Sequence, residues 1–381
     1  MEKAPGYISN LTPLRGVAAL LVFLLHFQAL VTNFIFPSQT HFFELSYLMV
    51  DLFFIMSGFI ILHVYGSRFS TGMSVRNFSE FTLARFARIY PLHLFTLVVL
   101  IIFAAIANAW GPIFDPKAIP ANILLIHSFG LFHIFTWNVP SWSISAEWWA
   151  YMIFPLIVLF LSKNKRLAIL TLIPLIVLTY CALMYWLPRK NYFVPNVPVP
   201  HNLDITFDYG YIRGMAGFVT GMLAYELYQS RLLANFFQKD LVALLVVLGT
   251  IYLMHVKIND GICILLFALV VLCFACNDGR LQRLCNFRFA QFIGDISYSI
   301  YLIQTFLFVP FLSGLRLPLI KYGNAITESK ATFWVGLMYF AIFLVVIIGL
   351  STLSYIFIEV PCRKWLNGKW KKPRPAYAPL A

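Results

Sequence analysis

A histidine and two carboxylates are expected at similar depth in three apolar segments of the chain. His26 follows Arg15 by eleven residues in the first segment, Asp51 lies in the second, and Glu147 lies in the fourth. Eleven residues are about three helical turns, so Arg15 and His26 share one stripe of a helix, roughly 16 Å apart along its axis. Ionisable side chains inside a bilayer are costly and often functional. The grouping indicates either a buried polar site or a structural cluster of ion pairs between helices.

The imidazole is the member of this group best suited to proton transfer. Its reference pKa near 6.5 lets His26 take a proton from a hydroxyl group close to neutral pH. A neighbouring carboxylate, Asp51 or Glu147, would fix the imidazole tautomer and stabilise the imidazolium.

Two arginines, Arg85 and Arg88, lie between the second and third apolar segments. Their spacing of three residues places both side chains on one face of a helix. Guanidinium groups suit phosphates because each can donate two parallel hydrogen bonds. The pair indicates either a phosphate site or arginines that contact lipid headgroups and set the topology.

No group of residues has the spacing of a defined metal site. His201, Asp204 and Asp208 share an outer loop, which either faces an acceptor or is simply solvated. We therefore predict no metal and no tightly bound cofactor.

The composition indicates the kind of scaffold that must position these residues. Of 381 residues, 61% are hydrophobic and 11% are charged, with a net charge of +13. Soluble domains have about 45–50% apolar and about 25% charged residues. A soluble enzyme, a disordered chain and a nucleic-acid-binding protein are therefore excluded.

We predict an all-α, polytopic transmembrane bundle of about ten spans, each needing about 20 apolar residues. The expected spans are 11–33, 45–65, 90–109, 143–161, 167–187, 209–228, 239–256, 260–277, 292–313 and 331–358.

The distribution of positive charge predicts the orientation of this bundle. With a cytoplasmic N-terminus, most of the 28 Lys and Arg residues fall in cytoplasmic segments. Because cytoplasmic loops carry an excess of Lys and Arg, we expect both termini in the cytoplasm. Residues 1–368 are expected to form the membrane-embedded domain, and residues 369–381 a flexible, basic, Pro-rich tail.

Six segments together resemble acyltransferase family 3, a family of integral membrane acyltransferases that includes many carbohydrate O-acetyltransferases. Their order and spacing match the family from about residue 9 to residue 366. The segments are Leu14–Leu20 with His26, Val50–Phe59, Arg85–Pro91, Trp142–Glu147 with Tyr151, Ser297–Leu302 and Phe357–Pro361. The sequence departs from the family at Gln304, where many members carry His. Gln cannot titrate, although it can hydrogen-bond.

The resemblance implies a membrane O-acyltransferase with a cytosolic acyl-CoA donor and an acceptor hydroxyl group. His26 would be the base, assisted by Asp51 or Glu147, and a covalent acyl-histidine is the variant mechanism. The CoA phosphates would be held at the cytoplasmic mouth by Arg15, Arg85 and Arg88. Supporting residues are expected at Ser143, Tyr151, Tyr298, Gln304 and Glu359, with a structural or donor-side role for the last.

The acceptor implied by the resemblance is a carbohydrate, either a polysaccharide unit, a lipid-linked sugar or a glycolipid, and the acyl group is expected to be acetyl. The expected location is the bacterial inner membrane. A polysaccharide-biosynthesis or transfer protein is a candidate partner, and nucleic acid is not.

Three alternative functions stay open. They are an acyltransferase of lipids or small molecules, a transporter or flippase of a lipid-linked sugar, and a non-catalytic scaffold. A transporter would move substrate without acyl-CoA turnover and would usually show internal repeats.

Overall fold

The computed structural model describes residues 8–188, 201–312 and 330–370, and within these ranges the chain is helical, with no strand. The predicted all-α class is therefore confirmed. The longer helices are α1 (Leu11–Leu30), α2 (Met49–Phe69), α3 (Val75–Ala107), α5 (Trp142–Lys163), α6 (Lys165–Cys181), α7 (Gly210–Ser230), α9 (Asp240–His255), α10 (Asp260–Cys276), α12 (Arg288–Asp295), α13 (Ser297–Leu312), α15 (Lys330–Ser354) and α16 (Val360–Trp370). Short elements are η1 (Glu44–Leu48), η2 (Pro116–Ala118), α4 (Ile119–Ile123), η3 (Val139–Ser141), η4 (Ala182–Trp186), α8 (Ala234–Phe237), α11 (Arg280–Cys285) and η5 (Tyr355–Glu359).

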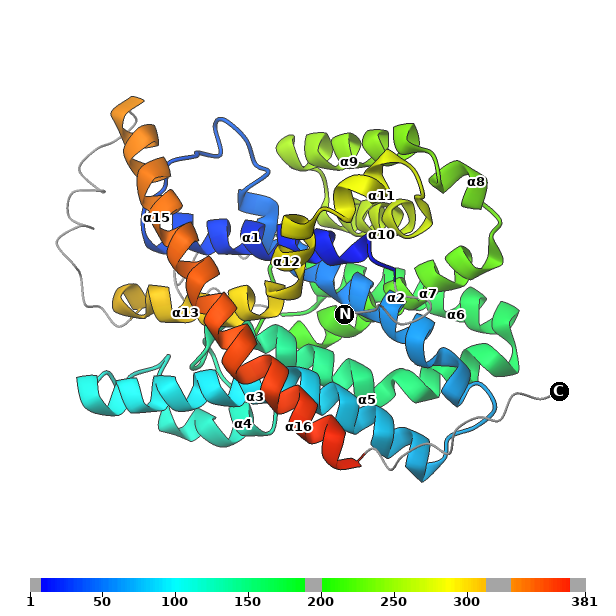
Figure 1. Cartoon of the computed structure of the whole chain (residues 1–381), viewed down its shortest axis with the longest axis horizontal. Helices are drawn as coiled ribbons and strands as arrows, with labels where there is room; N and C mark the ends of the chain where they lie inside the picture. The colour runs from blue at the N-terminus through cyan, green and yellow to red at the C-terminus, as the bar shows by residue number, and fades with distance from the viewer. Residues whose placement is uncertain (1–7, 189–200, 313–329, 371–381) are drawn as a thin grey trace.

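The helices pack around a centre formed by α1, α2, α5, α7 and α13. Helix α2 lies against α7, α7 lies against α5, and α1 lies against both α12 and α13. Helices α15 and α16 form a long diagonal that crosses α13 and then α3 (Figure 1). The centre is filled with apolar side chains, including the fully buried Phe23, Phe59 and Phe154.

The described helices include six that are long and apolar enough to cross a membrane, which makes the protein a multi-pass membrane protein. A seventh candidate is the pair α12 and α13, which is bent by 60°. The predicted count of ten spans is thus not confirmed. Helices α9 and α10 have 16 and 17 residues, fewer than the 20 or so that a bilayer core needs. Helix α7 has 21 residues but carries Arg213 and Glu226.

The C-terminal helix extends slightly past the predicted domain boundary at residue 368. From Lys330 to Trp370 the chain is continuously helical, with the π-turn η5 between α15 and α16. The extra residue of a π-turn rotates the chain and is common at functional sites. Here the turn ends at Glu359, whose side chain is buried. The predicted tail lies almost entirely outside the described residues.

Helices α2 and α7 approach so closely that only glycine fits at two positions of their interface. A Cβ on Gly58 would lie 1.9 Å from the backbone oxygen of Phe218, and one on Gly221 would lie 1.9 Å from that of Ile55. Small residues at fixed spacing let helix backbones meet in this way. The contact fixes α2 against α7 and thereby the positions of Asp51 and Ser57.

Replacing Gly58 with alanine is expected to lower the free energy of unfolding, because the added methyl group would collide with backbone rather than with a flexible side chain. Overpacking of this kind costs about 1–3 kcal/mol. The measurement is the thermal unfolding midpoint of purified protein in lipid. Gly249→Ala is the matched control, since nothing lies within 4 Å of its added Cβ. Equal midpoints for the two variants would contradict the close packing.

Candidate active site

A cavity of about 130 Å³ lies among α1, α2, α3, α5 and α13. A cavity of about 150 Å³ holds one benzene molecule, so this space is large enough for a small acyl group. Polar side chains in its lining are Arg15, Ser57, Arg85, Arg88, Ser143, Glu147, Tyr151, Ser297, Tyr298 and Tyr301. The structure thus brings seven of the eleven predicted site residues into one cavity.

Glu147 is the carboxylate that faces this cavity, and it is held by two hydroxyl groups. The Ser57 hydroxyl on α2 donates to Glu147 Oε1 over 2.7 Å, and the Tyr151 hydroxyl, one turn along α5, donates to the same oxygen. The Ser57 and Tyr151 oxygens are 3.2 Å apart. Ser57 was not among the predicted site residues, although its polar side chain in an apolar span was a usable signal.

The two arginines of α3 that line the cavity, Arg85 and Arg88, differ in whether a carboxylate neutralises their charge. Arg88 Nη1 lies 3.2 Å from Glu359 Oε2, so a buried carboxylate neutralises its charge. Arg85 has no carboxylate partner among the described residues. It donates from Nη2 to the Tyr65 hydroxyl over 3.1 Å, and its buried Nε has no hydrogen-bond partner. The guanidinium lies over the rings of Tyr65 and Tyr151, at 5.1 and 5.9 Å. Arg85 is therefore the better placed of the two to bind an anion.

Glu359 and Tyr298 join the cavity wall from elements distant in sequence. The Ser299 hydroxyl donates to Glu359 Oε1, which leaves Oε2 for Arg88. Tyr298 lies under the Arg88 guanidinium, at 5.6 Å, and donates from its hydroxyl to the backbone oxygen of Ile89. Of the two roles expected for Glu359, this geometry gives it a structural position on the arginine side of the cavity.

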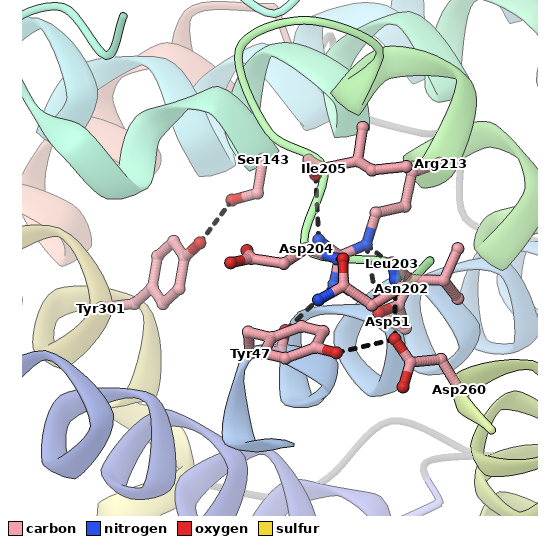
Figure 2. A network of polar contacts seen from close by, with 10 residues as sticks. All are labelled: Tyr47, Asp51, Ser143, Asn202, Leu203, Asp204, Ile205, Arg213, Asp260 and Tyr301. Carbon is pink, nitrogen blue, oxygen red and sulfur yellow. Dashed lines mark hydrogen bonds and ion pairs between the residues drawn. The ribbon is translucent and has the colours of Figure 1, made fainter. Parts of the chain in front are cut away.

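Asp51 has a different partner from the predicted one. Its carboxylate accepts from Arg213 Nε over 3.1 Å and from Arg213 Nη2 over 2.5 Å, and both side chains are fully buried (Figure 2). The expectation that Asp51 would orient His26 is therefore corrected. Both carboxylate oxygens face the guanidinium of α7, and Asp51 does not line the cavity.

Arg213 also binds the two chain segments that precede α7 and α2. Its Nη1 donates to the Ile205 oxygen over 2.9 Å, and its Nη2 donates to the Tyr47 oxygen over 3.0 Å. Asp260 extends the network, because its Oδ2 accepts from the Tyr47 hydroxyl and from the Leu203 backbone N–H. Sequence reasoning missed Arg213 and Asp260 as site neighbours, although a lone arginine in an apolar segment was a signal.

His26 pairs with Gln304 and with no carboxylate among the described residues. Its Nδ1 lies 3.1 Å from Gln304 Oε1, while Gln304 Nε2 donates to the Tyr301 backbone oxygen over 2.8 Å. The second bond fixes which end of the amide faces the histidine. His26 is absent from the cavity lining, but Gln304 follows the cavity residue Tyr301 by one turn of α13. His26 therefore lies about one helical turn beyond that end of the cavity.

A hydrogen bond between Ser143 and Tyr301 lies in the cavity wall at this same end. The Ser143 hydroxyl donates to the Tyr301 hydroxyl over 2.9 Å and joins α5 to α13. In the described part of the chain, no three His, Cys, Asp or Glu side chains are grouped so that they could hold a metal ion. The site thus consists of arginines, a carboxylate held by two hydroxyls, further hydroxyls and a histidine at the far end.

Comparison with known proteins assigns this membrane bundle to a family of acyltransferases. The family model described as an acyltransferase domain matches residues 8–356, nearly the whole chain. The protein belongs to acyltransferase family 3, which confirms the resemblance expected from its motifs.

Two curated relatives match shorter stretches of the chain. The acyltransferase MdmB of Streptomyces mycarofaciens is 32% identical over 158 residues, which are 39% of this chain and 38% of that protein. Protein 2 in the picA locus of Rhizobium radiobacter is 40% identical over 99 residues, which are 26% of this chain and 47% of that protein. The matches span less than half the length of each relative. No solved structure matches the chain.

Proposed function

We propose that the protein is a membrane O-acyltransferase that moves an acyl group, expected to be acetyl, from acyl-CoA to a carbohydrate hydroxyl. Family membership supports acyl transfer, and the cavity supports a small acyl group. The observation that contributes most is the convergence of three arginines, Arg15, Arg85 and Arg88, on one cavity of about 130 Å³. Such a site accepts the thioester end of a long donor whose phosphates stay at its mouth.

The donor binds from the arginine side in this proposal. Arg85, without a carboxylate partner, contacts a phosphate of CoA, and Arg15 and Arg88 line the path beside it. From the charge asymmetry of the loops, we expect this side to face the cytoplasm, where acyl-CoA is made. The uncharged pantetheine arm then carries the acyl group toward the Ser143–Tyr301 end.

His26 is the proposed base at that end. The Gln304 amide oxygen only accepts hydrogen bonds, so it holds His26 in the tautomer with Nδ1 protonated. Nε2 then carries the lone pair. It takes the proton of the acceptor hydroxyl as that oxygen attacks the thioester carbonyl. The carbon–sulfur bond breaks, and the CoA thiolate leaves and receives a proton. This arrangement explains how Gln304 can replace a family histidine without itself titrating.

Glu147 is proposed to position the Ser57 and Tyr151 hydroxyls on the cavity wall, because it already accepts hydrogen bonds from both.

A covalent acyl-histidine is the alternative path, and an acyl group trapped on His26 in the absence of acceptor would establish it. The runner-up function is an acyltransferase acting on a lipid or small molecule, which would share the donor side of the cavity. The bacterial inner membrane is the proposed location.

Replacing Arg85 with alanine is expected to raise the Kd for acetyl-CoA about 10-fold or more, because a charge-assisted phosphate contact is lost. The measurement is equilibrium binding of acetyl-CoA to purified protein in lipid. Arg76→Ala is the matched control, since Arg76 lies on the same helix with its side chain 85% exposed. Wild-type affinity for acetyl-CoA in the Arg85 variant would overturn the proposed donor site. An equal loss of affinity in both variants would show that Arg85 acts only through general electrostatic attraction.

A further inference from the structure

We propose that residues 283–289, the α11–α12 turn, bind the headgroups of acidic phospholipids at the surface of the membrane. The turn ends α11, begins α12 and contributes nothing to the cavity lining. Lipid binding there is therefore independent of the proposed acyl transfer.

The side chains of the α11–α12 turn combine exposed apolar groups with exposed positive charge. Six of its seven residues are exposed, and the other, Cys285, is buried. The large apolar side chains are Leu284, Phe287 and Phe289, which are 71, 65 and 59% exposed. Arg283 and Arg288 lie among them in the chain. Interfacial segments have this composition, because their apolar side chains enter the acyl boundary while Arg or Lys contacts the headgroups.

No carboxylate among the described residues neutralises the charge of the turn. Neither Arg283 nor Arg288 forms an ion pair within that part of the chain. Arg280, just before the turn, differs from them. The Asp240 carboxylate accepts hydrogen bonds from the backbone N–H groups of Arg280 and Leu281 and so lies beside that arginine. Two guanidiniums are thus left to bind phosphodiesters, to which each can donate parallel hydrogen bonds.

Hydrogen bonds hold the turn level with the first residues of α1. Gln291 Nε2 donates to the backbone oxygens of Ser9 and Cys285, over 2.9 and 2.7 Å. Asn10 Nδ2 donates to two backbone oxygens at the end of α10. Helices α11 and α12 both lie against α1 (Figure 1). Because α1 is long and apolar enough to cross a membrane, its first residues mark where the chain enters the bilayer. From the loop charges, we expect this boundary to be the cytoplasmic one.

The α11–α12 turn is already in a fixed conformation. The Asn286 N–H donates to the Gln282 oxygen over 2.9 Å, and the Phe287 N–H donates to the Leu284 oxygen over 3.1 Å. Helix α12 is also packed tightly on α1, since a Cβ on Gly294 would lie 2.1 Å from a backbone oxygen of that helix. A fixed turn loses little conformational entropy when a ligand binds.

An acidic lipid fits the turn better than two other occupants. A soluble phosphate would pair with the arginines but leave the three apolar side chains in water. A second copy, packed by a two-fold axis through this same patch, would bring arginine against arginine. An acidic phospholipid supplies both the negative headgroup and the apolar chains.

The test titrates purified full-length protein in detergent with phosphatidylglycerol or phosphatidylcholine and counts bound lipids by native mass spectrometry. Arg283→Gln combined with Arg288→Gln is expected to raise the Kd for phosphatidylglycerol about 10-fold or more, because two charge-assisted headgroup contacts are lost. Wild type should bind phosphatidylcholine more weakly, and the double variant should leave that binding and the thermal midpoint unchanged. The control is Lys163→Gln combined with Arg166→Gln, which removes two exposed positive charges from the α5–α6 connection.

Each other outcome would overturn the inference in a different way. An unchanged Kd for phosphatidylglycerol in the double variant would exclude the arginines as headgroup ligands. The same rise in the control variant would assign binding to overall charge, and equal Kd values for the two lipids in wild type would exclude headgroup selection. Displacement of the lipid by glycerol phosphate would indicate a site for soluble anions. A lipid-free dimer that the double variant loses would make the patch an interface between copies.

Discussion

Replacing His26 with alanine is expected to lower kcat for acyl transfer about 10²–10⁴-fold, the range typical of losing a general base. The Kd for acetyl-CoA is expected to stay close to that of wild type, because His26 lies beyond the cavity that the arginines line. Steady-state transfer rates and equilibrium donor binding, measured on the same preparation, separate the two effects. His63→Ala is the matched control: this histidine is also on a membrane helix, pairs with Tyr225 and does not line the cavity.

The role of Gln304 gives this prediction a second readout. Gln304→Leu removes the acceptor for His26 Nδ1 and should lower kcat, whereas Gln304→Asn retains an amide and should be less impaired. A fully active His26→Ala protein would exclude the histidine as base. Glu147, the carboxylate that does face the cavity, would then be the next candidate.

Replacing Asp51 with alanine is expected to destabilise the protein by about 3–5 kcal/mol, because it leaves the Arg213 guanidinium buried without a counter-ion. The loss should also loosen the segment at Ile205, which Arg213 holds. Thermal or denaturant unfolding in lipid measures the effect. Glu44→Ala is the comparison, since its pair with Lys257 is partly exposed and such pairs contribute less than about 1 kcal/mol.

A double variant distinguishes a buried charge from a packing defect. If the cost comes from the unpaired guanidinium, Asp51→Leu combined with Arg213→Met should recover much of the stability lost in Asp51→Ala. A double variant as unstable as the sum of the two single variants would show that shape, not charge, dominates this contact. Wild-type stability in Asp51→Ala would contradict the ion pair itself.

The sequence predicted which helices meet at the site better than it predicted which side chains meet. Position along a helix follows from a rise of about 1.5 Å per residue, so the similar depth of Asp51 and Glu147 could be read directly. Rotation about the helix axis depends on the neighbouring helix. Asp51 therefore faces Arg213 on α7, whereas Glu147 faces Ser57 and the cavity. No local pattern distinguishes these two directions.

Contacts between distant parts of the chain were the least predictable. The pair between Arg88 and Glu359 joins residues 271 positions apart and depends on a π-turn that hydropathy does not reveal. Likewise, apolar stretches mark ten segments, but they do not show that α9 and α10 end after 16 and 17 residues. Motifs that stay within one helix, such as Arg85 with Arg88, were placed correctly because their spacing alone brings them to one face.

Acyl transfer itself is tested most directly with labelled acetyl-CoA, purified protein in lipid, and an extract of the host's lipid-linked and polymeric carbohydrates. Wild type is expected to move the label to a carbohydrate as an alkali-labile ester, whereas His26→Ala is expected to bind acetyl-CoA but transfer almost none. Folded wild-type protein that binds no acyl-CoA and labels no carbohydrate would contradict the proposed acyl transfer.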